Sequence, residues 1–310
     1  MDKNKRNGHL ALLLANIFFG LNNPVSRSMM PELMSPYVLT FFRLGGGAAL
    51  FWLCSLFVKR EHIPLKDIGL LFVAAILCHT INLTGFFVGL SQTTSIDASI
   101  VVTLLPVISM LLAAVIIKEP ITFKKAFGVF VGASGALLLV LGKHGGEGLG
   151  TGIAGDLIVL AAVTSFALYI TVFKGLISKY SVVSTMKWMF LFASLQSYPF
   201  CHADLMATDF ASFSPSVWWR LAYMVVIATF VSYLLLVVGQ KSLRPTTLAM
   251  YNYVQPIIAS LAAVAWGMGK LGFLEFLSAA LVFTGVYFVT QSKSRAQMEA
   301  EKALNSKELS

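Results

Sequence analysis

The stretch F-F-G-L-N-N-P-V-S-R, residues 18–27, follows directly on an apolar run that begins at Leu10. If residues 9–30 cross a membrane, two amides and a helix-breaking proline stand inside it. The whole chain is 57% apolar and only 12% charged, with a mean hydropathy of +0.79, whereas an average soluble domain has about 25% charged residues. The chain is therefore expected to lie mostly in lipid, where the polar residues of 18–27 need partners or a cavity.

Ten segments of the chain have the length and composition of membrane spans, which need about 20 mostly apolar residues each. The sequence therefore predicts an all-α membrane protein with ten transmembrane helices. Their predicted bounds are 9–30, 37–58, 67–91, 96–117, 122–142, 152–173, 182–203, 216–240, 245–268 and 271–291.

The lysines and arginines predict the orientation of these spans. With the N-terminus in the cytoplasm, 18 of the 23 fall at cytoplasmic ends or in cytoplasmic loops, 4 fall outside, and Arg43 lies within the second span. Because cytoplasmic loops of membrane proteins are enriched in these residues, both termini are expected in the cytoplasm. The alternation also favours an even number of spans.

The two halves of the chain resemble each other at a shift of about 150 residues. Pro106 aligns with Pro256, and at a shift of 147 the stretch 18–27 aligns with S-F-A-L-Y-I-T-V-F-K at 165–174. Each half holds five predicted spans, an odd number, so the halves enter the membrane with opposite polarity, as in many secondary transporters. The predicted organisation is a first five-helix repeat at 1–142, a linker at 143–151, a second, inverted five-helix repeat at 152–291 and a cytoplasmic tail at 292–310.

Two stretches carry a resemblance to a known family. The run F-G-L-N-N-P-V-S-R (19–27) resembles the first-span signature W-G-s-n-f-v-a-i-K of EamA-type members of the drug/metabolite transporter superfamily, with Phe and Arg in place of the first Trp and last Lys. F-A-L-Y-I-T-V-F-K (166–174) resembles the partner signature of the second half. The resemblance covers residues 9 to 291 and implies an inner-membrane carrier with a central cavity between the halves, commonly an exporter of metabolites or amino acids.

The resemblance is unequal between the two halves at one motif. I-K-E-P-I-T (117–122) carries the Glu that follows the Pro-bearing fourth span, whereas G-M-G-K-L (267–271) lacks the matching Glu. An equal role for the two positions is therefore not expected.

Polar and aromatic side chains recur within the spans. Asn16 and Asn23 lie on one face of the first span, and Asn22 stands at the repeat position of Tyr169. Such side chains suit a cavity in which aromatic rings hold the apolar part of a substrate and amides orient its polar part, and the alternative is hydrogen bonding between helices. The predicted substrate-binding residues are Asn16, Asn22, Asn23, His79, Asn82, Phe86, Tyr169, Ser232, Tyr233, Tyr251, Asn252 and Gln255.

Three of the polar positions have competing interpretations. His79 could couple transport to protons, or it could be a neutral histidine satisfied by a neighbouring helix. Arg43 could bind a carboxylate, or it could extend to the outer surface. Asn22 is favoured over Asn23 to face the cavity because it matches the family signature.

No catalytic or metal-binding constellation stands out, and no Asp or Glu lies deep in a span. Embedded acids often mark proton relays or cation sites, so a neutral or zwitterionic solute is expected rather than a cationic drug. The prediction is an alternating-access secondary transporter of a small neutral or zwitterionic metabolite such as an amino acid, acting as an exporter, with no enzymatic activity, cofactor or metal. The alternatives are an exporter of cationic drugs and a membrane-embedded lipid-modifying transferase using His202, Asp204 and Asp209.

The expected partners are the small-molecule substrate and membrane lipids, and no nucleic acid is expected. The small residues of G-V-F-V-G-A-S-G (128–135) predict close helix packing. That packing joins the fifth and tenth spans or serves a homodimer contact. The expected location is the plasma (bacterial inner) membrane.

Overall fold

The computed structural model describes residues 3–30, 32–93, 98, 101–143, 153–265, 272–293 and 297–299. Helices are the only regular secondary structure in these residues. Most of the predicted linker at 143–151 and of the predicted tail at 292–310 lies outside them.

The first half of the chain contributes seven described helical elements. Several predicted spans are built from more than one of them, because a π-helix or a proline interrupts the regular α-helix. The elements are α1 (Lys3–Arg27), α2 (Pro36–Ser55), α3 (Leu65–Ala75), the π-helix η1 (Ile76–Thr84), α4 (Gly85–Gln92), α6 (Leu105–Ile116) and α7 (Phe123–Lys143).

The second half is built in the same way. Its described elements are α8 (Ile153–Val172), α9 (Lys174–Lys179), α10 (Val182–Ala207), the short 3₁₀-helix η2 (Phe210–Ser212), α11 (Pro215–Val225), the π-helix η3 (Val226–Val231), α12 (Ser232–Ser242), α13 (Pro245–Met250), the 3₁₀-helix η4 (Tyr251–Tyr253), α14 (Val254–Ala265) and α15 (Phe273–Gln291).

Serines and prolines start several of these helices. The Ser35 side chain accepts a hydrogen bond from the backbone of Val38 at 3.3 Å, and Pro36 follows in the first turn of α2. Ser181 caps α10 in the same way. A serine at this position satisfies a backbone N–H that the helix leaves free, and proline has no N–H to satisfy. These residues therefore fix where α2 and α10 begin.

Within the described residues, four helical stretches are long and apolar enough to cross a membrane by length and composition. They are Pro36–Ser55, Leu65–Gln92, Ile153–Val172 and Pro215–Ser242, and shorter apolar helices include Leu105–Ile116. Large apolar side chains such as Phe123, Phe273 and Trp219 are mostly exposed on the outside of the helices. Because a soluble monomer rarely exposes so much apolar surface, this outer surface suits contact with lipid tails.

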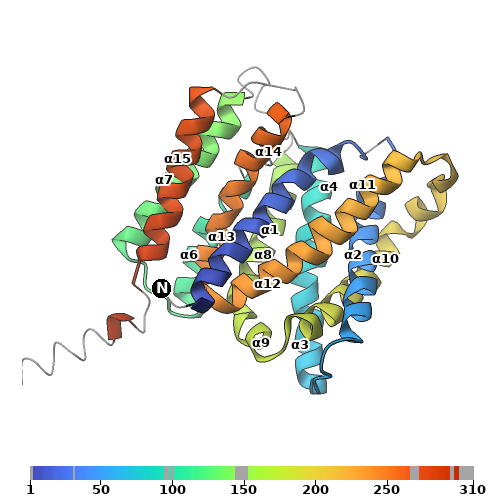
Figure 1. Cartoon of the computed structure of the whole chain (residues 1–310), viewed down its shortest axis with the longest axis horizontal. Coiled ribbons are helices and arrows are strands. Elements are labelled where there is room, and N and C mark those ends of the chain that lie inside the picture. The colour runs from blue at the N-terminus through green and yellow to red at the C-terminus, as the bar shows by residue number, and fades with distance from the viewer. Residues whose placement is uncertain are drawn as a thin grey trace, which may run out of the picture.

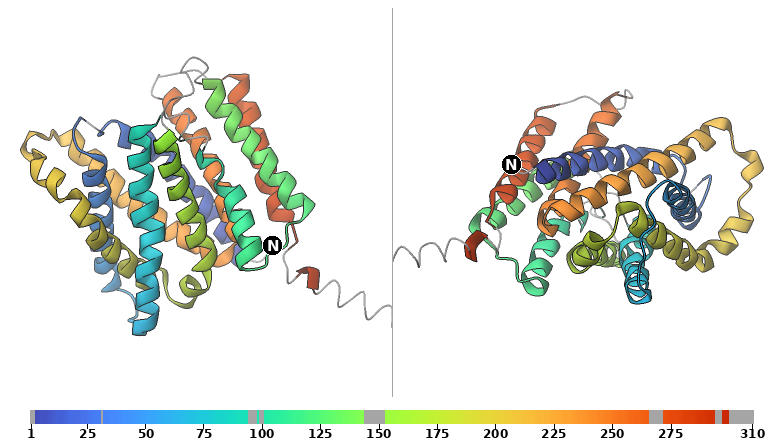
Figure 2. Two further views of the ribbon diagram at one scale, coloured as in Figure 1. Left: turned by 180° about the vertical axis from the view of Figure 1, so that it is seen from behind. Right: turned by 60° about the horizontal axis from the view of Figure 1, so that its bottom comes forward.

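Helices from opposite halves pack against each other throughout the molecule. Helix α7 lies along α15 at one edge, and α2 packs on α10 toward the other edge (Figure 1). Between these edges α1 packs on α12 and α14, while α8 packs on α4 and α6. The view from behind shows α4 and α8 side by side (Figure 2).

Glycines bring α7 and α15 into close contact. A Cβ atom on Gly285 would lie 2.5 Å from the backbone oxygen of Gly128 and 2.6 Å from the backbone nitrogen of Gly132. Only glycine on both helices permits this distance. The small-residue face of 128–135 is therefore used for packing on the tenth predicted span.

The two π-helices occupy equivalent places in the two halves. η1 covers Ile76–Thr84 and η3 covers Val226–Val231, so both begin at positions 150 residues apart. Pro106 and Pro256 likewise each stand within the first turn of a helix, α6 and α14. Irregular turns of this kind are uncommon in helices and are frequent at functional sites.

Candidate functional site

A cavity of about 210 Å³ lies between elements of the two halves. Its lining includes α1, α2, the η1–α4 stretch and α8 together with α12 and the η4–α14 stretch. Six of the predicted substrate-binding residues line it: Asn22, Asn82, Phe86, Tyr233, Asn252 and Gln255. Asn16, His79, Tyr169, Ser232 and Tyr251 do not belong to its described lining, and the side chain of Asn23 is outside the described part of the chain.

The cavity also has lining residues that the sequence did not single out as binding residues. They are mostly apolar, and they include the aromatic residues Phe19, Phe87, Phe166 and Tyr253. Tyr253 donates a hydrogen bond from its hydroxyl to the backbone oxygen of Thr103 at 2.7 Å, which joins two repeat-equivalent positions. Phe19 stands at the Trp position of the first-span signature, and that match is the feature of the sequence that could have identified it as a lining residue.

A chain of amides forms one wall of the cavity. The Gln255 side-chain nitrogen donates to Asn16 Oδ1 at 2.8 Å and to Asn252 Oδ1 at 2.7 Å. Asn16 in turn donates to the backbone oxygen of Leu12 at 2.8 Å. Asn16 thus lies behind the lining residue Gln255, and the hydrogen bond between them joins α1 to α14.

Of the two adjacent asparagines in residues 18–27, the structure describes the side chain of Asn22. Asn22 is buried and lines the cavity, and its Nδ2 donates to Ser26 Oγ at 2.9 Å. Its Oδ1 has no hydrogen-bond partner among the described residues. The side chains of Asn23 and Arg27 lie outside the described part of the chain. On the opposite wall, Asn82 donates to the backbone oxygen of Ala162 at 2.9 Å and so joins η1 to α8.

Arg43 turns into the protein and lines the cavity. Its side chain is only 3% exposed. Nε donates to Thr229 Oγ1 at 3.0 Å, and Nη2 donates to the backbone oxygen of Ala228 at 3.1 Å. The interpretation of Arg43 as a residue that extends to the outer surface is therefore wrong, because the carbonyl and hydroxyl of η3 bind it inside.

His79 is buried outside the cavity lining, where its ring packs against other rings. Its ring lies 4.4 Å from the ring of Phe190 and 4.9 Å from that of Tyr233, measured between centroids. Neither ring nitrogen has a hydrogen-bond partner among the described residues, so a partner on a neighbouring helix, as expected for a neutral histidine, is not found there. The π-helix changes the angular spacing of residues, which separates His79 from Asn82 and Phe86 although the three share a face at α-helical spacing.

Three other predicted residues, which are not in the cavity lining, make hydrogen bonds within or between helices. The Tyr169 hydroxyl donates to Gln240 Oε1 at 3.0 Å. Tyr251 pairs through its hydroxyl with His9 Nδ1 at 2.8 Å. Ser232 donates to the backbone oxygen of Ile227 at 2.8 Å, within the π-helical stretch. Their contribution to any binding acts through the positions of α8, α12 and η4.

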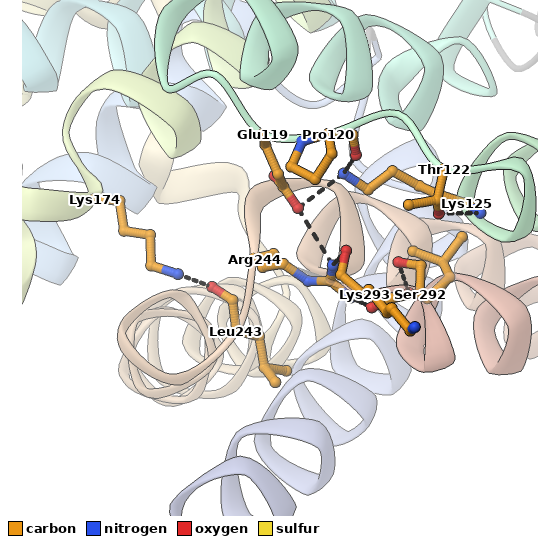
Figure 3. Close-up of polar contacts among 10 residues, drawn as sticks. Glu119, Pro120, Thr122, Lys125, Lys174, Leu243, Arg244, Ser292 and Lys293 are labelled. Atoms are coloured by element: carbon orange, nitrogen blue, oxygen red, sulfur yellow. Dashed lines mark hydrogen bonds and ion pairs between the residues drawn. The ribbon is translucent and has the colours of Figure 1, made fainter. Parts of the chain in front are cut away.

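A buried ionic cluster joins the two halves near the N-terminal end of α1 (Figure 3). Glu119 Oε1 lies 2.8 Å from Lys125 Nζ and 3.5 Å from Arg244 Nη1. Arg244 also donates to the backbone oxygens of Val289 and Ser292, at 3.1 and 2.9 Å. We call Glu119, Lys125 and Arg244 the ionic cluster; it connects the α6–α7 joint to the α12–α13 and α15 ends.

The ionic cluster has a charged neighbour. Lys174 donates from Nζ to the backbone oxygen of Leu243 (Figure 3). Burial lowers the pKa of Lys174, an effect that Glu119 partly opposes. Contacts between the halves therefore join the helices at the end of the molecule that holds these residues, whereas Asn22 lies near the opposite end of α1 and Arg43 lies in the N-terminal half of α2.

Two of the residues considered for an enzyme, Asp209 and His202, make local contacts. The Asp209 carboxylate accepts from the backbone of Ala211 at 3.1 Å and so caps η2. His202 stacks edge-on against Tyr198. Among the described residues no group of three or more His, Cys, Asp or Glu side chains could hold a metal ion.

Comparisons with known proteins identify a family for this chain. The sequence profile of the EamA-like transporter family matches residues 6–141 and 153–291. The chain is 23% identical over 285 residues to the "Uncharacterized transporter YyaM" of Bacillus subtilis, which covers 90% of this chain and 92% of that protein. It is 22% identical to an "Uncharacterized transporter" of Archaeoglobus fulgidus, with 92% and 99% covered.

More distant similarity extends to plants and to a solved structure. The "WAT1-related protein At1g43650" of Arabidopsis thaliana is 23% identical, with 93% of this chain and 92% of that protein covered. One crystal structure matches with a TM-score of 0.77 at 17% identity, over 91% of this chain and 96% of the other. At that identity the match concerns the fold.

Proposed function

Because this chain belongs to the EamA-like transporter family and is thus a multi-pass membrane transporter, we propose that it exports a small neutral or zwitterionic metabolite, such as an amino acid, by alternating access. The cavity between the halves is the proposed binding site. Its amides and aromatic rings carry the proposal, because the amides orient polar groups while the rings hold an apolar part.

The lining also bears on the charge of the substrate. Among the described residues that line the cavity, Arg43 is the one with a formal charge, and none is Asp or Glu. A site for a hydrophobic cation is expected to hold a carboxylate. The lining therefore supports a neutral or zwitterionic substrate over a cationic drug.

Alternating access rests on the proposed inverted repeat of two five-helix halves and ten spans. The packing of α1 on α12 has its counterpart in α8 on α4, and that of α1 on α14 has its counterpart in α8 on α6. The π-helices at equivalent positions and the two separate stretches matched by the family profile support the same repeat. Two similar halves can exchange conformations and so expose one site alternately to each side.

We propose that both termini lie in the cytoplasm and that the described conformation is closed on that side. Support comes from the ionic cluster and the His9–Tyr251 pair, which join the halves at the N-terminal end of α1. Opening toward the cytoplasm would require these contacts to break. The substrate would then enter from the cytoplasm and leave on the other side.

Counterflow in liposomes tests the proposal. Purified protein in liposomes loaded with a mixture of the twenty amino acids should accumulate a labelled amino acid from outside, and protein-free liposomes should not. Phe86→Ala removes a ring from the cavity and should slow counterflow. Phe200→Ala removes an exposed ring from α10 and should leave it unchanged. If no amino acid shows counterflow, the proposed substrate class is wrong.

A further inference from the structure

Arg43 carries a charge inside the protein that no acidic side chain in the described part of the chain balances. No Asp or Glu among the described residues forms an ion pair with it. The titratable groups that interact electrostatically with Arg43 are Tyr233, Tyr223 and His79. The guanidinium remains charged in proteins, so the cavity wall holds a fixed positive charge.

The hydrogen bonds of Arg43 leave part of its guanidinium available. Nε and one terminal nitrogen bind Thr229 and the backbone of Ala228. These two bonds use two of the five N–H groups of an arginine side chain. Both acceptors are neutral, so they orient the side chain without neutralising it.

A buried charge without a partner is costly, and a ligand of opposite charge removes that cost. A carboxylate matches the planar fork of a guanidinium and can form paired hydrogen bonds with it. One arginine balances one negative charge, which fits a carboxylate better than a doubly charged phosphate ester.

A second polar side chain in the lining, Asn22, has one atom for which the described residues supply no hydrogen bond. Asn22 is 4% exposed, one end of its amide binds Ser26, and its Oδ1 accepts no hydrogen bond from the described residues. A buried acceptor of this kind costs free energy until a donor reaches it. An amino group on the ligand would supply that donor.

We propose that the cavity binds a solute bearing a carboxylate, with Arg43 holding the carboxylate and Asn22 accepting from an N–H group of the same solute. The rings of Phe19, Phe86 and Phe166 then face its apolar part. This inference rests on the proposed function, because it assigns the substrate class of the same cavity.

The test uses three matched compounds and separates binding from transport. Leucine carries both groups, 4-methylpentanoate lacks the amino group, and 3-methylbutylamine lacks the carboxylate. The same three forms of phenylalanine and valine extend the set. Binding is measured as the rise in unfolding temperature of the purified protein, and transport as counterflow in liposomes.

We expect compounds with a carboxylate to bind and the amines to fail. Arg43→Gln should weaken carboxylate binding at least tenfold, because loss of one partner of a buried charge pair usually costs more than an order of magnitude in affinity. Arg43→Lys keeps the charge but loses the fork and should be intermediate. Arg220→Gln removes an exposed arginine of α11 and should leave binding unchanged.

The neutral amide 4-methylpentanamide shows whether Arg43→Gln still folds around its cavity. In that variant the amide should bind at least as tightly as 4-methylpentanoate, which reverses the order in the unaltered protein. The inference is overturned if the amines bind as well as the acids, if no acid binds, or if Arg43→Gln keeps the preference for acids. Acid binding without counterflow would support the inference and reject the proposed transport of these solutes.

Discussion

Replacing Gly285 by alanine tests the close packing of α15 on α7. The added Cβ would lie 2.5, 2.6 and 2.7 Å from the Gly128 oxygen and from the nitrogen and Cα of Gly132. All three are backbone atoms, so no flexible side chain can move aside. Ordinary contact between carbon atoms requires about 3.5 to 4.0 Å, so the helices must separate by roughly 1 Å at this point.

The size of the effect follows from a matched substitution. Gly69 of α3 has no atom within 4 Å of a built Cβ. Both substitutions gain about 1 kcal/mol of helix propensity, and only Gly285→Ala adds the overpacking cost of about 1 to 3 kcal/mol. The difference between the two variants should therefore be about 1 to 3 kcal/mol, with Gly285→Ala the less stable.

Reversible unfolding in mixed micelles of SDS and a mild detergent, followed by tryptophan fluorescence, measures both variants. Gly285→Ala should unfold at a lower SDS fraction than Gly69→Ala. Gly128→Ala approaches the same contact from the other helix, and its Cβ would lie 2.7 Å from the Gly285 oxygen. Equal midpoints for Gly285→Ala and Gly69→Ala would mean that α7 and α15 do not touch at this glycine.

Three further predictions concern polar contacts. Glu119→Gln leaves Lys125 buried, at 0% exposure, without its counter-charge and should destabilise the protein by about 3 to 5 kcal/mol; a thermal melt that matches the unaltered protein would contradict this. Gln255→Leu should slow counterflow at least tenfold, and a lowered melting temperature with unaltered counterflow would make the amide wall purely structural. Burial works to raise the pKa of Glu61, but hydrogen bonds from Ser181 outweigh it and the pKa is lowered. The stabilisation by Glu61 is therefore complete above its unfolded pKa near 4.5 and is lost as the pH falls through the lower folded value, so the melting-temperature gap to Glu61→Gln should close in that window.

The length and composition of the apolar segments were enough to predict an all-helical membrane protein, because both are properties of the sequence alone. Asn22 and Gln255 could also be placed in the cavity, since an amide within a span must face protein or a cavity. Those predictions depend on local composition. They do not depend on how one helix is rotated against another.

The direction of individual side chains depended on partners far away in the chain. Arg43 points inward because η3, nearly two hundred residues later, offers it a hydroxyl and a carbonyl. His79 lies apart from Asn82 because η1 is a π-helix, which ordinary periodicity does not reveal. Tyr253 lines the cavity while the predicted Tyr251 pairs with His9, because η4 winds as a 3₁₀-helix between them.

The ionic cluster has no twin in the other half of the sequence. At a shift of 150 residues, Glu119 meets Gly269, Lys125 meets Glu275 and Arg244 meets Thr94. If the two halves exchange conformations, the conformation closed on the outer side therefore has no counterpart of the ionic cluster that stabilises the conformation closed on the cytoplasmic side. In that case the two conformations differ in free energy. The empty carrier rests in the conformation that is open to the outside, and the change to the conformation that is open to the cytoplasm costs free energy. Weakening the ionic cluster would then raise the population of the conformation that is open to the cytoplasm, although no residue of the cavity is changed.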